Sequence, residues 1–196
     1  IIMFSGLYPI RMAVTEDDGA SWSELKPIGN FGGIVTMATV IGLKMPGEYL
    51  AFFHDDGRFI RGGDMEKYRV KGPSSDHTSA AAKPWRFWVY TTLSKDGGLT
   101  WSAPAPIAML PDANLCEPGV LRSPDGKQIA VLLRENSRKY NSFVIFSNDE
   151  GSGGRHRLVQ NVAWTRSVAT AGTPDLVVVR LSLHATGRGQ ARQTST

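Results

Sequence analysis

Two short segments of the chain carry the residue types that acid–base and anion-binding chemistry need. One contains Glu117, with Arg134 following 17 residues later, and the other is the polar run 54–58, His-Asp-Asp-Gly-Arg. Carboxylates and imidazoles exchange protons in general acid–base catalysis, and a guanidinium can hold a carboxylate through two parallel hydrogen bonds. Each segment also has a structural interpretation. Glu117 could be a loop carboxylate that accepts backbone N–H groups, and residues 54–58 could form a polar Asx-type turn.

Three similar turns divide the chain and indicate which elements must position those side chains. They span Thr15–Trp22, Ser94–Trp101 and the shorter Ser147–Gly151, and they share the pattern Ser/Thr-x-Asp-x-Gly, which we call the aspartate turn. The aspartate can accept backbone N–H groups, the glycine permits a positive φ, and the tryptophan that completes the first two turns can pack on its own sheet. The residues to which we assign this structural role are Asp17, Gly19, Trp22, Asp96, Gly98, Trp101, Asp149 and Gly151.

A second set of turns recurs in step with the aspartate turns. It comprises 45–47 (Met-Pro-Gly), 124–126 (Pro-Asp-Gly) and, more faintly, 174–175 (Pro-Asp). Each precedes a run rich in β-branched and aromatic residues, at 49–53, 129–133 and 176–179. Further strands are predicted just before aspartate turns, at 87–93 and 143–146, and no helical periodicity is visible. The repeating unit is therefore strand, Pro/Gly turn, strand, loop, strand, aspartate turn, strand.

This unit is a four-stranded antiparallel meander, so we predict an all-β fold, and radial repetition of the unit would make a propeller. The aspartates of the turns are 79 and 53 residues apart, and the longer interval holds a Gly-, Ser- and charge-rich stretch, 57–83, that we predict to be a long loop. Both kinds of turn lie at one end of such a meander. Glu117, Arg134 and His54 are then expected together at the opposite end.

These features resemble the sialidase superfamily, whose Asp boxes, or BNR repeats, decorate a six-bladed β-propeller. The resemblance covers residues 10–151 and is sharpest at 114–117 (Asn-Leu-Cys-Glu), followed by 120–121, 124–126 and 132–134. It implies a partial propeller of about three four-stranded blades. It also implies that Glu117 activates a nucleophilic tyrosine and that Arg134 holds the carboxylate of a sialic acid. Asp55 and Asp56 are further candidates for catalysis as a general acid or a sugar-binding carboxylate, with His54 and Arg58 as substrate contacts.

The activity that the resemblance implies is removal of terminal sialic acid, or a related acidic sugar, from glycoconjugates by a retaining exo-glycoside hydrolase. A tyrosine of ordinary pKa near 10 needs a carboxylate to remove its proton, and sialidases use such a tyrosine. The family's tyrosine and its other two arginines have no match in this chain. We therefore expect an incomplete catalytic domain that is inactive alone. The alternatives are a non-catalytic carbohydrate- or protein-binding propeller and a misassembled fragment with exposed strand edges.

Composition limits the other classes of function. The net charge of +4 arises entirely after residue 151, because 1–151 hold 16 Lys plus Arg against 17 Asp plus Glu, so a nucleic-acid partner is not indicated. Neither metal-ligand spacing nor a phosphate-binding loop is visible, and we predict no cofactor. The only cysteine, Cys116, is expected to be a buried thiol. No apolar run is long enough for a membrane span.

The chain divides at residue 151 in this interpretation. Residues 1–151 are assigned to the sialidase-like blades, and residues 152–196 form a divergent tail that loses the repeat and has six arginines but neither Lys nor Glu. A frame-shifted or disordered tail would explain that change. No signal peptide is recognisable, and the chain begins with Ile1 rather than Met, as a fragment without its true start would. The sequence sets neither the compartment nor the oligomeric state.

Overall fold

The computed structural model describes residues 1–60, 87–110, 113–138 and 140–151, together with the backbone of 157–160, 164–166 and 179–181. These residues form strands, turns and loops without a helix, which confirms the predicted all-β class. Most of the predicted loop 57–83, the turn 174–175 and most of the tail 152–196 lie outside the described residues.

Three antiparallel sheets account for most of the strands, and we name them in chain order. The first sheet contains β1 (Ile2–Ser5), β2 (Arg11–Val14) and β3 (Lys26–Pro27). The second contains β4 (Val35–Gly42), β5 (Tyr49–Asp55), β6 (Trp88–Ser94) and β7 (Ala105–Ala108). The third contains β8 (Leu115–Arg122), β9 (Ile129–Glu135), β10 (Phe143–Ser147) and β11 (Arg157–Gln160). A separate pair joins β12 (Trp164–Arg166) to β13 (Val179–Leu181).

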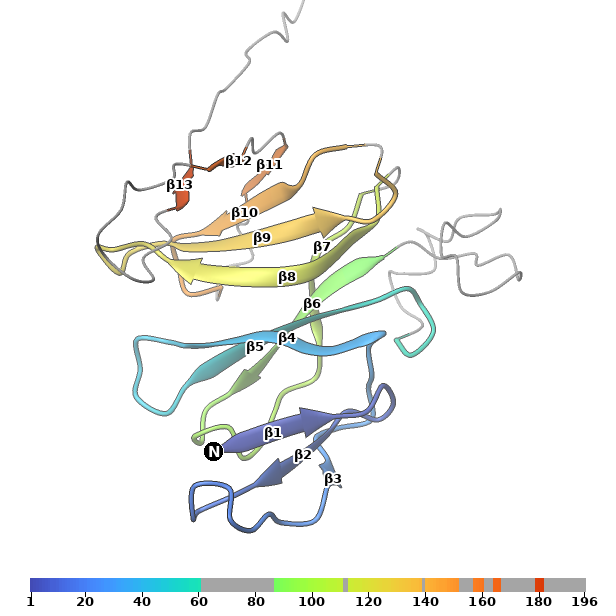
Figure 1. Cartoon of the computed structure of the whole chain (residues 1–196), viewed down its shortest axis with the longest axis vertical. Coiled ribbons are helices and arrows are strands. Elements are labelled where there is room, and N and C mark those ends of the chain that lie inside the picture. Colours follow the sequence, from blue (N-terminus) through green and yellow to red (C-terminus); the bar gives the residue numbers. More distant parts are fainter. Residues whose placement is uncertain are drawn as a thin grey trace, which may run out of the picture.

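Within each sheet, consecutive strands pair in chain order, so the predicted meander is confirmed for the second and third sheets. Figure 1 shows the second sheet lying between the first and the third. The strand β11 follows the third aspartate turn and pairs with β10, so the third sheet continues into the region that the sequence assigns to the divergent tail. The division of the chain at residue 151 stays a prediction.

The turns occupy the places that the sequence predicts. The aspartate turns connect β2 to β3, β6 to β7 and β10 to β11, while the Pro/Gly turns connect β4 to β5 and β8 to β9. Because consecutive strands are antiparallel, these connections share one end of each sheet, which we call the turn end. The opposite end, which we call the site end, carries the start of β8 and the ends of β5 and β9.

Hydrogen bonds within the aspartate turns explain their sequence pattern. Asp96 Oδ1 accepts the Thr100 N–H at 2.9 Å, and Ser94 Oγ accepts the Gly98 N–H at 2.8 Å. Bonds from the Thr100 side chain, then its backbone, lower the pKa of Asp96 to about 2. The shorter third turn keeps the equivalent bond, because Ser147 Oγ accepts the Gly151 N–H at 2.9 Å. The positive φ of Gly98 and Gly151, 91° and 79°, accounts for the glycine in the pattern.

Strand β5 supplies side chains to two core layers because successive residues point to opposite faces of a sheet. Phe52 is buried with Val131 and other side chains of the third sheet, whereas Phe53 is buried with Ile10, next to the first sheet. The Phe53 ring stacks on that of Tyr90 with 5.6 Å between centroids. Burial on both faces accounts for the nearly continuous apolar run of β5.

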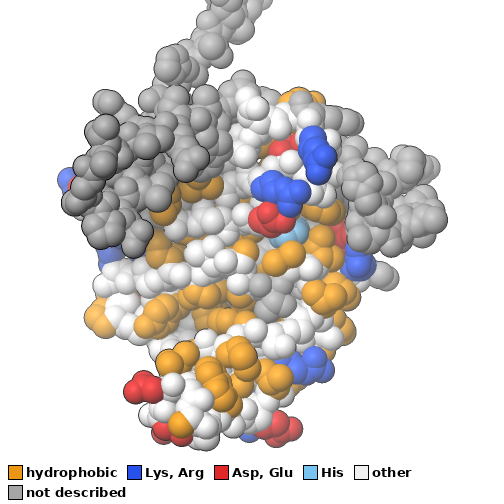
Figure 2. All heavy atoms as spheres, viewed as in Figure 1, with side chains coloured by type: hydrophobic (Ala, Val, Ile, Leu, Met, Phe, Trp, Pro, Cys, Tyr) orange, Lys and Arg blue, Asp and Glu red, His pale blue; other side chains and the backbone are white. Residues whose placement is uncertain are grey.

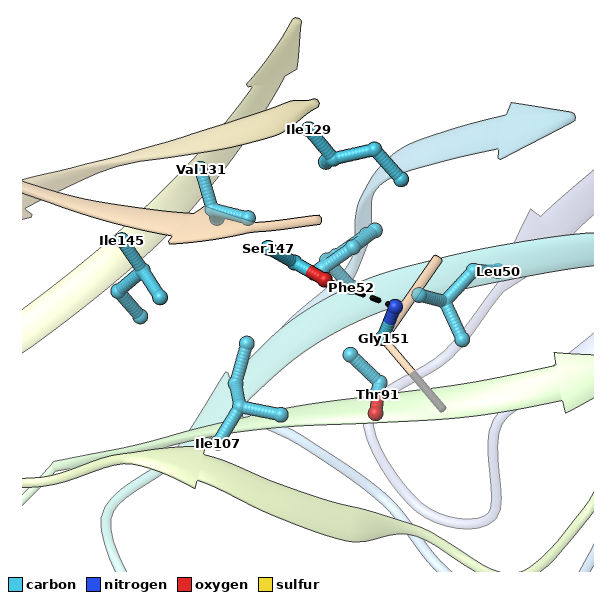
Figure 3. Close-up of a pocket in the computed structure, with 9 residues that line it drawn as sticks. All are labelled: Leu50, Phe52, Thr91, Ile107, Ile129, Val131, Ile145, Ser147 and Gly151. Atoms are coloured by element: carbon cyan, nitrogen blue, oxygen red, sulfur yellow. Dashed lines mark hydrogen bonds between the residues drawn. The ribbon is translucent and has the colours of Figure 1, made fainter. Parts of the chain in front are cut away.

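A small gap remains in the core layer between the second and third sheets (Figure 3). Its volume is about 20 Å³, and most of its walls are aliphatic or aromatic side chains, among them Phe52, Ile129 and Ile145. The bond between Ser147 and Gly151 lies at its edge, so the third aspartate turn closes this part of the core. A gap of this size and polarity is a packing defect rather than a ligand site.

Candidate functional site

A β-bulge at the site end of β8 sets the direction of Glu117. Cys116 pairs with Arg134 of β9 and Gly119 pairs with Leu132, so two residues of β8 face one residue of β9. Glu117 is the first residue of the bulge and has a φ of 49°. A left-handed conformation costs a residue with a side chain about 1–2 kcal/mol, so surrounding contacts must hold it. Bulges of this kind redirect a side chain at the edge of a sheet.

The bulge brings Glu117 to Arg134, as the sequence predicts. Arg134 Nη1 donates to Glu117 Oε1 at 2.6 Å, and the two side chains are 47 % and 49 % exposed. Among the described residues, the remaining N–H groups of this guanidinium have no hydrogen-bond partner. Figure 2 shows acidic and basic side chains grouped with a histidine on one face of the molecule. Arg134 can therefore bind an anion without giving up its contact with Glu117.

His54 joins this pair from the second sheet. The Glu117 N–H donates to His54 Nδ1 at 3.3 Å, which links the end of β5 to the bulge of β8. The imidazole is 3 % exposed, and its burial lowers the pKa of His54 to about 4, against the opposing charges of Glu117 and Asp56. His54 is therefore neutral at neutral pH. Because Nδ1 accepts a hydrogen bond, the proton is assigned to Nε2.

Asp55 has the contacts of a turn residue. Its Oδ2 accepts the N–H groups of Gly57, Phe59 and Ile60 at 2.9, 3.1 and 3.0 Å, which is the Asx-type arrangement considered from the sequence. The carboxyl group is fully buried, and Oδ1 has no partner among the described residues. Burial raises the pKa of Asp55. These contacts account for the residue without catalysis, and its catalytic role stays a prediction.

Asp56 and Arg58 form an ion pair beside Asp55. Arg58 Nη2 and Nε lie 3.1 and 3.3 Å from Asp56 Oδ2, and the Arg58 N–H also donates to Oδ1. The Asp56 side chain is 1 % exposed, whereas that of Arg58 is 40 % exposed. The pair reduces the charge that Arg58 offers to a ligand, and the catalytic and substrate-binding roles of these two residues stay predictions.

Glu135, which directly follows Arg134, is structural. It accepts the backbone N–H groups of Asn114 and Ser137 at 3.0 and 2.9 Å, and so ties the loop before β8 to the end of β9. Burial opposes ionisation, but these hydrogen bonds hold the pKa of Glu135 below its ordinary value. Cys116 is buried as predicted, and burial raises the pKa of its thiol to about 12, which makes it a poor nucleophile.

Two supporting contacts were not predicted. Thr39 of β4 donates from Oγ1 to the carbonyl of Pro118 at 2.8 Å, so the second sheet holds the bulge at a second point beside the His54 contact. The irregular register of β4 between Val35 and Thr39 accompanies this approach. Contacts between sheets leave no periodic signal in a sequence, so neither Thr39 nor the acceptor role of His54 could be read from the pattern.

The described tyrosines lie in other settings. Tyr49 begins β5 at the turn end, Tyr8 donates to Asn30 at 2.6 Å, and Tyr140 packs edge-on against Phe143. Tyr90 is 1 % exposed, and its burial raises the pKa of the phenol, which opposes formation of a nucleophilic phenolate. Tyr68 lies outside the described residues.

Searches for metal sites, membrane spans and related proteins add nothing to the site. The described residues contain no group of three or more His, Cys, Asp or Glu side chains placed to hold a metal ion. In the part of the chain that the structure describes, no helical segment has the length and hydrophobicity that a membrane crossing requires. No protein-family model matches the chain, and no curated protein matches it. The geometry of Glu117, Arg134 and His54 therefore carries the functional argument.

Proposed function

We propose that this chain carries part of the site of a sialidase-like exo-glycoside hydrolase that removes terminal sialic acid from glycoconjugates. The observation that supports this proposal is the pair of half-exposed side chains, Arg134 and Glu117, on a bulge at the site end of the sheets. The guanidinium supplies a site for an anionic sugar, and the adjacent carboxylate supplies a base.

Arg134 suits the carboxylate of a sialic acid because its planar fork can form two parallel hydrogen bonds. Its Nη1 holds Glu117 at 2.6 Å, which leaves Nε and Nη2 as a second edge for a ligand. Lysine would offer a point charge without that geometry. A substrate carboxylate bound to the second edge would also draw positive charge away from Glu117, and a less strongly paired carboxylate is a better base.

The proposed fold is a β-propeller in which the second and third sheets are complete blades. Its support is the repeated four-stranded meander with both kinds of turn at one end. The first sheet has three strands in the structure, and its aspartate turn joins β2 to β3, the last two of them. By comparison with the second sheet, these three strands correspond to the second, third and fourth of a blade.

The test is hydrolysis of a fluorogenic sialoside by the protein expressed from its complete open reading frame. Glu117→Gln keeps the size of the side chain and removes its basicity, so the rate should fall by about 100-fold or more. Glu48→Gln is the matched control, because Glu48 adjoins the Pro/Gly turn at the far end of the second sheet. Equal rates for wild type and Glu117→Gln would refute the catalytic assignment.

A second candidate is a carbohydrate-binding protein that does not hydrolyse its ligand. It is favoured by one observation: among the described residues, Arg134 is the only hydrogen-bond and ion-pair partner of the Glu117 side chain, so no tyrosine hydroxyl is hydrogen-bonded to it. This candidate predicts saturable binding of N-acetylneuraminic acid that depends on Arg134, with no release of the fluorophore from the sialoside. Slow turnover that Glu117→Gln abolishes would exclude it.

A further inference from the structure

The backbone of Glu117 is held by a residue from another sheet. Its φ of 49° is uncommon for a residue with a side chain, and its N–H donates to His54 Nδ1 at 3.3 Å. We propose that His54 is a positioning residue: by accepting this N–H, it keeps Glu117 in the left-handed conformation that directs the carboxylate to Arg134. The catalytic consequence of this inference rests on the proposed function, whereas the hydrogen bond between Glu117 and His54 does not depend on it.

The setting of His54 suits an acceptor that must not move. The residue pairs with Val35 on one side and Val89 on the other, so its backbone is fixed within the second sheet. Its ring is 3 % exposed and lies 5.6 Å from the ring of Phe87. A buried and neutral imidazole can present an unprotonated nitrogen, which a lysine or a protonated histidine cannot do.

The charges around His54 come from both sheets. Asp56 directly follows β5, the strand that carries His54, and Glu117 and Arg134 lie on the third sheet. Glu117 and Asp56 favour the protonated imidazole, whereas burial and Arg134 oppose it, and burial dominates. The imidazole therefore stays neutral because it is buried, and the positive charge of Arg134, which pairs with Glu117 at 2.6 Å, offsets part of the effect of that carboxylate.

A purely structural role for His54 would make it a ring that fills space beside Phe87. The two roles separate with two substitutions. In His54→Asn, the amide oxygen occupies nearly the place of Nδ1 and can accept the same N–H, whereas His54→Leu fills a similar volume with no acceptor. If His54 only fills space, His54→Leu should behave more like wild type. If His54 positions Glu117, His54→Asn should.

The experiment is amide hydrogen exchange of the full chain, followed by NMR for wild type and both variants. We expect the Glu117 amide to exchange about tenfold faster in His54→Leu, as the loss of one hydrogen bond implies, and to stay close to wild type in His54→Asn. The Val131 amide, in β9 within the third sheet and away from His54, reports loss of global stability and serves as the internal reference. Unchanged exchange at Glu117 in His54→Leu, after correction by Val131, would overturn the proposal, and so would an Asn variant that behaves like the Leu variant.

The catalytic consequence is measured separately, with the fluorogenic sialoside and the protein expressed from its complete open reading frame. His54→Leu should lower kcat by about tenfold with a smaller change in KM, and His54→Asn should restore most of kcat, because the base is displaced while Arg134 still binds the substrate. If the wild type does not hydrolyse the sialoside, the proposed function fails, yet the exchange result still decides whether His54 positions Glu117. An active His54→Leu enzyme with unaltered kcat would overturn the catalytic consequence alone.

Discussion

The buried His54 should by itself make this protein less stable at acidic pH, by an amount that follows from its pKa in the folded state. The pKa of His54 falls from its ordinary 6.5 to about 4 in the folded protein, mainly because the imidazole is buried. Between these values the unfolded chain binds a proton that the native state excludes, so stability falls as the pH drops through this window. A pKa unit corresponds to about 1.4 kcal/mol, which gives a total loss of about 3 kcal/mol below pH 4.

The assay is urea unfolding followed by tryptophan fluorescence at several pH values between 7 and 4, with His54→Asn as the matched variant. The variant cannot titrate at this position, so its stability should fall less than that of the wild type, and the difference isolates His54. Contributions from the carboxylates, such as Glu135 with its lowered pKa, are common to both proteins and cancel. Parallel pH profiles for the two proteins would refute the assignment of a buried neutral imidazole.

Three further experiments test the core, one aspartate turn and one ion pair. Phe52→Ala should lower the free energy of unfolding by about 3–5 kcal/mol, because the 2 % exposed ring packs beside an existing gap; a urea midpoint close to wild type would contradict this. Gly98→Ala and Gly126→Ala both force a positive φ on alanine, but only the Cβ added at residue 98 would meet another side chain, Ile2 Cδ1 at 2.6 Å. Gly98→Ala should therefore have the lower melting temperature of the two variants. Equal melting temperatures would count against that contact. Arg122 of β8 pairs with Glu150 of the third aspartate turn at 2.6 Å, and a double-mutant cycle of Arg122→Met and Glu150→Gln should give a coupling energy of about 1 kcal/mol. A coupling energy of zero at low salt would exclude this ion pair as a stabilising link between β8 and the turn.

The parts of the fold that local patterns encode could be predicted from the sequence. Side chains alternate along a strand and turns need particular residues, so the strand at 129–133 and the turns around Asp96 and Asp125 could be placed within a residue or two. The antiparallel order then placed Glu117 and Arg134 at the same end. That prediction is confirmed by the 2.6 Å contact between them.

The rest of the site depends on how one sheet meets the next, which no local pattern encodes. The bulge at Glu117 is marked in the sequence by Pro118 and Gly119 within β8, but the acceptor for the Glu117 N–H lies 63 residues away at His54. The run 54–58 was ambiguous because its residue types suit both a turn and a site. The structure gives Asp55 the turn hydrogen bonds and His54 the contact with the site, a distinction that depends on which way successive side chains of β5 point.

The most direct test of the proposed anion site is an NMR titration of the Arg134 Nε–H signal with N-acetylneuraminic acid and, separately, with its methyl ester. The free acid should shift this signal saturably, while the ester, which lacks the carboxylate charge, should bind at least about tenfold more weakly. Arg134→Lys should weaken binding of the acid by a similar factor, because lysine keeps the charge but loses the bidentate geometry. An unmoved Arg134 signal, or equal binding of acid and ester, would contradict a carboxylate-binding role for Arg134.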